Sequence, residues 1–280
     1  MCRVIILANQ KGGVAKTTST VNIGIGLARL GKKVLLIDND PQGSLSQALG
    51  YPQPDKMEVS LANIYEWVLN EDDFDLDEGI LHHEEGVDIM PGNKKLTSVE
   101  MAMVSIIGSE GSLREYTDMM RDSYDYILVD CSPNLGKLTI NALVAADEVL
   151  IPTQATYLAL KGLEQLLKTI SLVRRKMNPR LKILGTLITM VDSRTLNGKE
   201  ITEIMYQYYG DKMNIYNTSI PFSVRAAEAS TEGMGLSSKV CKFFLRVCQV
   251  KCVNSFYTSF RNLVRYRVLT EIPVMVETCL

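Results

Sequence analysis

An uninterrupted apolar segment near the start of the chain leads directly into a glycine-containing loop. The segment RVIILA (3–8) has the β-branched, apolar composition of a short buried strand. The loop NQKGGVAKTT (9–18) follows it, and the next residues keep an apolar helical face up to Gly31, which is placed to end the helix. Gly24 and Gly26 weaken this helix, so we expect them to permit close packing on a sheet.

The same alternation continues along the chain. Further strands are predicted at KVLLID (33–38), GVDIMPG (86–92), YDYILVD (124–130), DEVLIPT (147–153) and LKILGTLITM (181–190). Helical stretches are predicted around Leu61–Asn70 and Leu113–Met120. Strands that alternate with helices predict an α/β fold with a mostly parallel, twisted sheet. Their near-continuous apolar character predicts helices on both faces of that sheet.

A change of composition divides the chain of 280 residues near its end. Residues 237–280 carry seven Lys/Arg and two Glu, whereas the whole chain has a net charge of −2. Four of the six cysteines also lie in this tail, and the other two, Cys2 and Cys131, give no sign of a disulfide framework. We therefore expect one domain at 1–236 and a divergent basic, cysteine-rich tail at 237–280.

No apolar run reaches the roughly 18 residues that a membrane-spanning helix needs, and the N-terminus lacks the pattern of a signal peptide. These absences predict a cytoplasmic protein. The adjacent His82 and His83 fall in a charged segment, which we interpret as a surface loop.

The loop at 9–18 has the strand–loop–helix context that a phosphate-binding loop requires. Gly12 and Gly13 allow backbone N–H groups to turn towards phosphate oxygens, and the following helix N-terminus attracts negative charge. Lys16 would reach the β- and γ-phosphates and Thr17 would bind Mg²⁺. The alternative interpretation is a glycine turn beside a lysine in the first turn of a helix.

Acidic residues end two of the predicted strands. Asp38 and Asp40 follow the strand at 33–38, and Asp130 ends the strand at 124–130. Ligands bind beyond the carboxyl ends of strands in open α/β sheets, where such carboxylates can hold Mg²⁺ through its water shell or orient an attacking water. A solvated turn or a helix cap is the alternative for each acid.

Four segments in this order resemble the short, Soj-like ParA-type partition ATPases of the deviant Walker A superfamily, which also includes the MinD regulators and the nitrogenase iron protein. They are KGGVAKTT (11–18), LLIDNDPQGSLS (35–46), YDYILVDCSPNLGKLTINAL (124–143) and IPFSVRAAEA (220–229), and the similarity runs from about residue 3 to 235. The P-loop of this family lacks the first glycine of the common motif, so Gln10 is expected there. A strand beginning at residue 3 places the chain with the short members, which lack an N-terminal helix-turn-helix.

The resemblance implies that ATP lies between two monomers and that Lys11 reaches across to the partner's phosphates. It also implies that Asp40 orients the hydrolytic water and contributes to the metal site, together with Asp130 and Thr17. The implied nucleotide contacts are Lys11, Gly12, Gly13, Val14, Ala15, Lys16, Thr17, Thr18, Met190 and Pro221. The implied cofactors are ATP and Mg²⁺.

Family members bind DNA without sequence preference as ATP-bound dimers and are released when a ParB-like centromere-binding protein stimulates hydrolysis. Arg225 matches one DNA-binding position of the family, and Arg194 is a second candidate. Such contacts neutralise phosphates and predict strong salt sensitivity. Each arginine is otherwise explained as a solvated surface side chain.

Two departures from the family pattern leave alternatives open. Ala15 replaces the glycine before Lys16, so a nucleotide-binding scaffold with negligible hydrolysis is one alternative. The tail at 237–280 resembles nothing in the family, and a basic amphipathic helix there would make the chain a MinD-like, membrane-associated regulator. Its apolar residues do not form one clean face, so we prefer to interpret the tail as a divergent or frame-shifted end that packs poorly. We therefore expect DNA and not a membrane as the partner.

Overall fold

The computed structural model describes residues 1–191, 196–211, 213–216 and 219–220. Their centre is a seven-stranded sheet with the order β3-β4-β2-β5-β1-β6-β7. The strands are β1 (Arg3–Leu7), β2 (Val34–Asn39), β3 (Leu81–His82), β4 (Asp88–Met90), β5 (Tyr126–Cys131), β6 (Glu148–Gln154) and β7 (Lys182–Thr189). The predicted α/β fold is confirmed, and each strand expected from the sequence forms within one or two residues of its expected bounds.

All pairings in this sheet are parallel except that of β3 with β4. Asp130 of β5 pairs in register with Leu7 of β1 on one side and with Asp38 of β2 on the other. The parallel pairing therefore brings the ends of three strands from distant parts of the sequence to one edge of the sheet.

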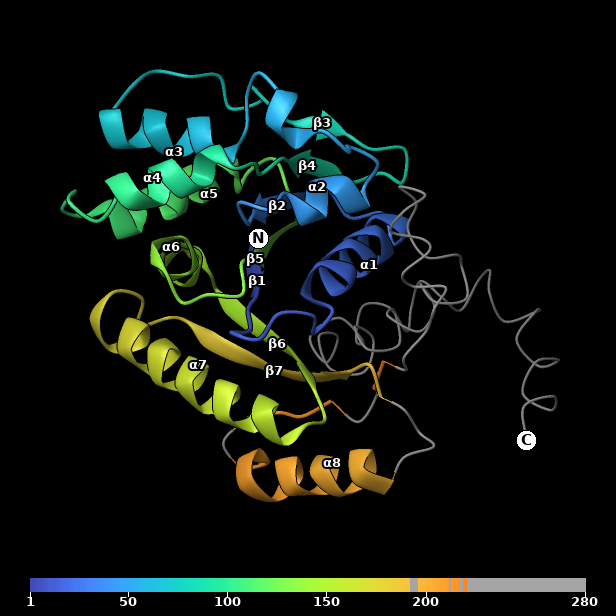
Figure 1. Ribbon diagram of the computed structural model, residues 1–280. Coiled ribbons are helices and arrows are strands. Elements are labelled where there is room, and N and C mark those ends of the chain that lie inside the picture. The colour runs from blue at the N-terminus through green and yellow to red at the C-terminus, as the bar shows by residue number, and fades with distance from the viewer. Residues whose placement is uncertain (192–195, 212, 217–218, 221–280) are drawn as a thin grey trace, which may run out of the picture.

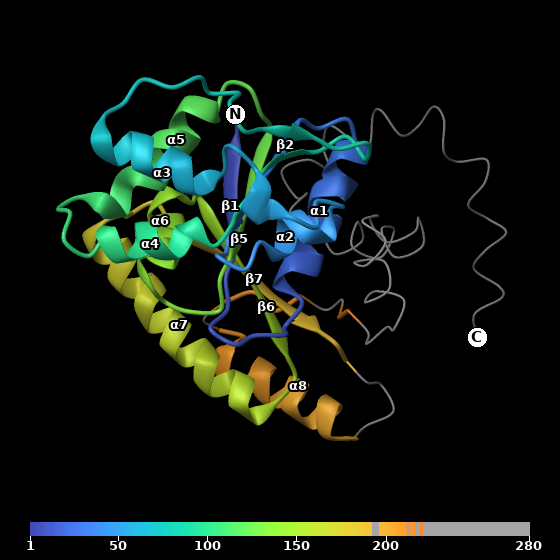
Figure 2. The same cartoon turned by 45° about the horizontal axis from the view of Figure 1, so that its top comes forward.

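Helices cover both faces of the sheet (Figures 1 and 2). On one face lie α1 and α2, and on the other lie α3, α5, α6 and α7, each face enclosing its own buried apolar cluster. The helices are α1 (Lys16–Arg29), α2 (Ser44–Ala48), α3 (Leu61–Asn70), α4 (Lys95–Ala102), α5 (Ser112–Met120), α6 (Lys137–Ala145), α7 (Tyr157–Lys176) and α8 (Leu196–Tyr209). Short 3₁₀ turns are formed by η1 (Pro54–Lys56) and η2 (Ser109–Gly111). Within these described residues, no helix is both long and apolar enough to cross a bilayer.

Gly24 of α1 lies against the sheet. A Cβ there would lie 2.6 Å from Leu36 Cδ2 of β2, so any larger residue would require the Leu36 side chain to shift. This confirms the close packing expected at Gly24. The helix stops at Leu30, and Gly31 follows with a φ of +75°, as expected for a helix-ending glycine.

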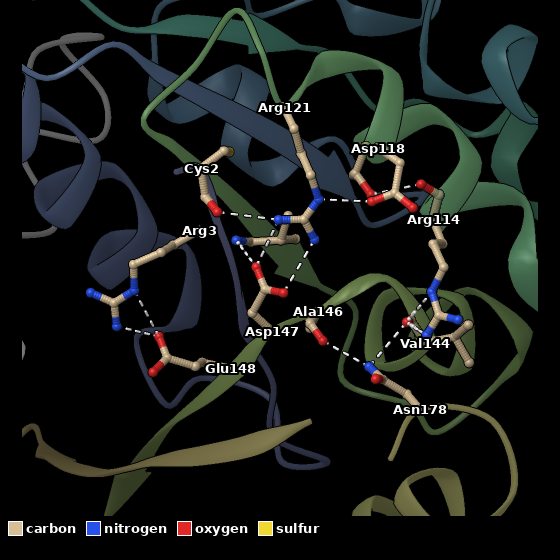
Figure 3. Close-up of polar contacts among 12 residues, drawn as sticks. Cys2, Arg3, Arg114, Asp118, Arg121, Val144, Ala146, Asp147, Glu148 and Asn178 are labelled. Atoms are coloured by element: carbon tan, nitrogen blue, oxygen red, sulfur yellow. Dashed lines mark hydrogen bonds and ion pairs between the residues drawn. The ribbon is translucent and has the colours of Figure 1, made fainter. Parts of the chain in front are cut away.

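Charged side chains hold the amino-terminal edge of the sheet together (Figure 3). Arg121, which follows α5, donates to both carboxylate oxygens of Asp147, at 2.9 and 3.2 Å, and to the Cys2 carbonyl at 3.2 Å. Asp147 also accepts the Val4 amide at 2.8 Å. This network fixes the start of β1 and β6 at the edge opposite the phosphate loop.

Asn178 caps the C-terminal end of α6 (Figure 3). Its buried amide nitrogen donates to the carbonyls of Leu143, Val144 and Ala146 at 2.7–3.0 Å. The last carbonyls of a helix have no partner inside it, so this side chain helps to satisfy three acceptors, of which the Val144 carbonyl also accepts from Arg114.

We predict that Asn178→Ala lowers the free energy of unfolding by roughly 1–3 kcal/mol, because it removes this donor from a buried site. Urea unfolding followed by circular dichroism measures the change. Gln165→Ala, at an exposed position of α7, is the matched control and should change stability by less than about 0.5 kcal/mol. An Asn178→Ala protein as stable as this control would contradict the capping role.

The expected loop at His82 is wrong. His82 lies in β3 and pairs with Asp88 of β4, because even a two-residue strand can extend the edge of an existing sheet. Its side chain is nevertheless 83% exposed, so the surface location is confirmed, and its Nδ1 lies 2.6 Å from Asp88 Oδ1. Cys2 and Cys131 are buried free thiols. The predicted boundary near residue 236 lies outside the described residues.

Candidate ATP and magnesium site

The loop between β1 and α1 forms an open cradle at the carboxyl edge of the sheet. Apart from the adjacent residues, no atom of the described part of the chain lies within 4 Å of the position that a Cβ would take on Gly12 or Gly13, and Gly13 has a φ of +67°. Polar contacts fix both ends of the loop. Asn9 accepts the Lys11 amide at 2.9 Å, and Thr189 of β7 donates to the Val14 carbonyl at 3.0 Å. Such a cradle fits phosphate groups approached by backbone N–H donors.

Lys16 places a cation at the floor of the cradle. Its side chain is only 8% exposed, and its Nζ donates to the Lys11 carbonyl at 3.3 Å. Burial lowers the pKa of the Lys16 amine, and the charge of Asp130 opposes this change. The structure places Lys16 beside the cradle, and a buried cation next to a glycine loop is suited to bind an anion.

Thr17 and Asp130 form the second part of the site. The Thr17 hydroxyl donates to Asp130 Oδ2 at 2.6 Å, and Thr20 donates to Asp130 Oδ1 at 3.2 Å. Burial raises the pKa of the Asp130 carboxyl to about 6, against the Thr17 hydrogen bond and the charge of Lys16. A hydroxyl and a carboxylate held together beside a phosphate cradle are the oxygen donors that Mg²⁺ prefers.

Asp40 lies on the loop between β2 and α2, at the same edge of the sheet. It is 9% exposed, and its Oδ1 accepts the Gln42 amide at 2.9 Å. Its charge is close enough to raise the pKa of Asp130. The structure therefore brings together the predicted residues Lys16, Thr17, Asp40 and Asp130.

Lys11 reaches towards the end of β6, to residues that the sequence analysis did not select. Its Nζ donates to Gln154 Oε1 and to Thr156 Oγ1, both at 3.3 Å. Gln154 also donates to the Gly13 carbonyl at 2.8 Å, and Thr156 is the N-cap of α7. The signal that could have found them is the polar run after DEVLIPT, because it ends a parallel strand at the ligand-binding edge.

The remaining predicted contacts divide into two groups. Thr18 lies in the first turn of α1, and Met190 follows β7 with a φ of +55° and a side chain that is 36% exposed. The Met190 sulfur lies 3.0 Å from Gln154 Nε2, beside the cradle. Pro221, Arg194 and Arg225 lie outside the described residues.

Ala15 adopts a left-handed conformation, with φ 59° and ψ 35°, at the N-cap of α1. Its carbonyl accepts the Ser19 amide at 2.9 Å, so this geometry begins the helix that carries Lys16 and Thr17. The left-handed region costs an L-residue roughly 1–2 kcal/mol. The departure from the family's glycine therefore introduces strain while leaving the cradle formed.

We predict that Ala15→Gly raises the free energy of unfolding by up to about 1 kcal/mol, because the relief of this strain exceeds the extra chain entropy of glycine. Chemical denaturation measures the difference. Ala28→Gly, in the last turn of the same helix, where the residue is not left-handed, is the control and should destabilise by roughly 0.5–1 kcal/mol. Equal destabilisation by both substitutions would show that Ala15 is not strained.

Comparison with known proteins shows the family to which the chain belongs. A family model described as an AAA domain matches residues 2–183. The sporulation initiation inhibitor protein Soj of Bacillus subtilis is 42% identical over 233 residues, which is 83% of this chain and 89% of Soj. The chromosome partitioning protein ParA of Caulobacter vibrioides is 38% identical over 233 residues, covering 82% of this chain and 85% of that protein.

Two solved structures extend the comparison to ligands. A Mycobacterium smegmatis protein named cobyrinic acid a,c-diamide synthase, solved with an ATP analogue and magnesium, has a TM-score of 0.74 at 37% identity. The alignment covers 83% of this chain and 92% of that one. A plasmid partition protein of Borrelia burgdorferi bound to AMPPNP has a TM-score of 0.71 at 25% identity, covering 88% and 98%.

The parallel sheet, the glycine cradle and the adjoining Thr17–Asp130 pair define a P-loop ATPase whose cofactors are ATP and Mg²⁺. Within this class, the chain belongs to the family that includes Soj and ParA, in the deviant Walker A superfamily. It is accordingly an ATP-dependent partitioning ATPase.

Proposed function

We propose that this chain is a DNA-segregation switch in which ATP binding drives formation of a homodimer that binds DNA without sequence preference. A ParB-like partner then stimulates an otherwise slow hydrolysis, which releases the dimer. This cycle places the protein on the nucleoid in the cytoplasm. The observation that carries the proposal is the grouping of Lys16, Thr17, Asp40 and Asp130 around the cradle, with Lys11 at its rim.

Each side chain has a role that follows from its position. Lys16, at the floor of the cradle, would neutralise phosphate charge. Thr17 would bind Mg²⁺ directly, and Asp130 would hold it through the water shell of the ion. Magnesium supplies charge neutralisation on the phosphates when it is bound. Asp40, on its own loop, would orient the attacking water.

The contacts of the Lys11 side chain support a role for this lysine at the phosphates of a second subunit. Its two side-chain contacts within the described residues are to an amide oxygen and a hydroxyl, at 3.3 Å each, so no carboxylate neutralises it there. A cation left without a counter-charge at the rim of the cradle is available to a phosphate of a partner subunit. Such a cation stabilises the charge that develops on the transferred phosphoryl group.

We predict that Asp40→Ala keeps ATP binding but traps the ATP-bound dimer on DNA, because only the orientation of the water is lost. Sizing with ATP and Mg²⁺, DNA retention and phosphate release together measure this outcome. Lys16→Ala is the control and should lose ATP binding and the dimer. Normal turnover in Asp40→Ala would remove the proposed role of Asp40, and an ATP-dependent dimer in Lys16→Ala would refute the phosphate-loop assignment.

A basic surface at the end of α7 supports DNA as the partner. Residues 170–182 contain five Lys/Arg and no acid, and all five side chains are exposed. They are Arg174, Arg175, Lys176, Arg180 and Lys182. The ion pairs found in the described part of the chain involve none of the five. Uncompensated cations on a rigid helix end can neutralise phosphates and release counterions from DNA.

We predict that replacing Arg174, Arg175 and Lys176 together by Ala weakens DNA retention and lowers the magnitude of its salt slope by roughly one for each phosphate that is no longer neutralised. Retention of the ATP-bound protein across a salt series measures both. Replacing the exposed Lys56, Lys94 and Lys95 by Ala removes three positive charges elsewhere, one of them paired with Asp55, and controls for a general loss of charge. Equal effects of both triple variants would exclude a local site, and ATP-dependent retention on anionic liposomes instead of DNA would favour the MinD-like alternative.

A further inference from the structure

Asp38 is a buried carboxylate of the site edge that the roles above do not use. It is the penultimate residue of β2 and is fully buried. Its Oδ2 accepts both the amide of Ser46 at 2.8 Å and the hydroxyl of Ser46 at 2.7 Å. Ser46 belongs to α2, so this pair closes the loop that carries Asp40.

The pair also supplies a helix cap that the loop itself lacks. Gly43, the N-cap of α2, has no side chain to accept the free N–H groups of the first turn. Asp38 accepts one of them from eight residues earlier in the chain. A carboxylate at a helix N-terminus is favourable, so the strand end fixes the position of the helix start.

Close packing holds the same loop from outside. A Cβ on Gly92 would lie 2.2 Å from the Asp38 carbonyl oxygen, and the Gly92 amide donates to Ser46 Oγ at 3.3 Å. A Cβ on Gly43 would lie 2.7 Å from Pro54 Cγ. These contacts leave the backbone around the Asp38–Ser46 pair little room to shift.

The other flank of Asp40 is fixed independently. The buried Asn39 donates to the Leu138 carbonyl of α6 at 2.9 Å and accepts the Tyr65 hydroxyl at 3.1 Å. Asp40 itself is held by the Gln42 amide of its own loop. The direction of the Asp40 carboxylate is therefore set by where the loop is anchored, and Asp38–Ser46 is the anchor on the α2 side.

We propose that Asp38 and Ser46 are positioning residues for ATP hydrolysis, which act by fixing the loop that carries Asp40. The inference rests on the proposed role of Asp40. Burial of a carboxylate is destabilising because its charge is removed from water, and a small displacement of a catalytic group can cost about 100-fold in rate. Burying Asp38 therefore lowers the stability of the fold, but it keeps Asp40 in place and so increases the rate of ATP hydrolysis.

The test measures phosphate release and ATP affinity separately in the full chain with Mg²⁺-ATP and DNA. Asp38→Ala removes both acceptor contacts, and we expect turnover to fall on the order of 10- to 100-fold with little change in the Kd for ATP. Asp38→Asn keeps an acceptor oxygen for Ser46 and should retain most of the turnover. Loss of ATP affinity in step with turnover would show a merely structural role and overturn the proposal.

If Asp38→Ala does not fold, Ser46→Ala tests the proposal in its place. It removes one of the two hydrogen bonds, and a several-fold fall in turnover is expected at unchanged ATP affinity. Ser44→Ala changes the same helix but leaves the Asp38–Ser46 pair intact, so it is the matched control and should behave as the parent. Parent-like turnover in Ser46→Ala would overturn the proposal.

A double substitution separates this inference from the proposed function. If Asp38 acts through Asp40, then Asp38→Ala causes no further loss of turnover in an Asp40→Ala background. The same fractional loss in both backgrounds would show that Asp38 acts independently and would overturn the inference alone. Normal turnover in Asp40→Ala by itself would instead remove the role of Asp40 on which the inference rests.

Discussion

The parallel pairing of β5 with β1 and β2 is the constraint on which the site depends. It places Asp130 level with Leu7 and Asp38, so the loop that leaves β1 must turn beside the Asp130 carboxylate. The hydrogen bond from Thr17 then joins the start of α1 to β5. One register thus fixes where the cradle, the Thr17 and Asp130 oxygens and the loop of Asp40 lie relative to one another.

Burial decides the electrostatics of this edge. Asp38 and Asp130 are both fully buried, and burial raises the pKa of their carboxyls to about 7 and about 6, with the Asp130 charge adding to the rise at Asp38. Lys16 is buried close by, with its pKa lowered for the same reason. A metal ion would stabilise the charged form of the carboxylates and a phosphate group that of the amine, so the site is arranged for ligands of both signs.

The sequence alone predicted six of the seven strands, the helices α1, α3 and α5, and the grouping of Lys16, Thr17, Asp40 and Asp130, because these follow from local composition and from the rule that parallel strands end at one edge. It did not predict α6, α7 or α8. It did not predict the contacts of Lys11 with Gln154 and Thr156, or the pairing of Asp38 with Ser46. Those depend on side chains that meet only after the chain has folded. The short strand at His82 was missed for a related reason, since a two-residue pairing is decided by its neighbour and not by its own composition.

The strand order also has a consequence for how the protein is made. The cradle is completed by residues 9–18, 38–40, 130 and 154–156, which come together only through parallel pairings over long sequence separations. Such pairings form slowly because their loops must close before the contacts stabilise them. Thr189 of β7 also holds the loop at Val14, so a growing chain cannot hold its nucleotide in the complete cradle until β7 has left the ribosome. The nucleotide binds only the folded chain and therefore stabilises it by mass action. This stabilisation begins only when the whole sheet has been synthesised.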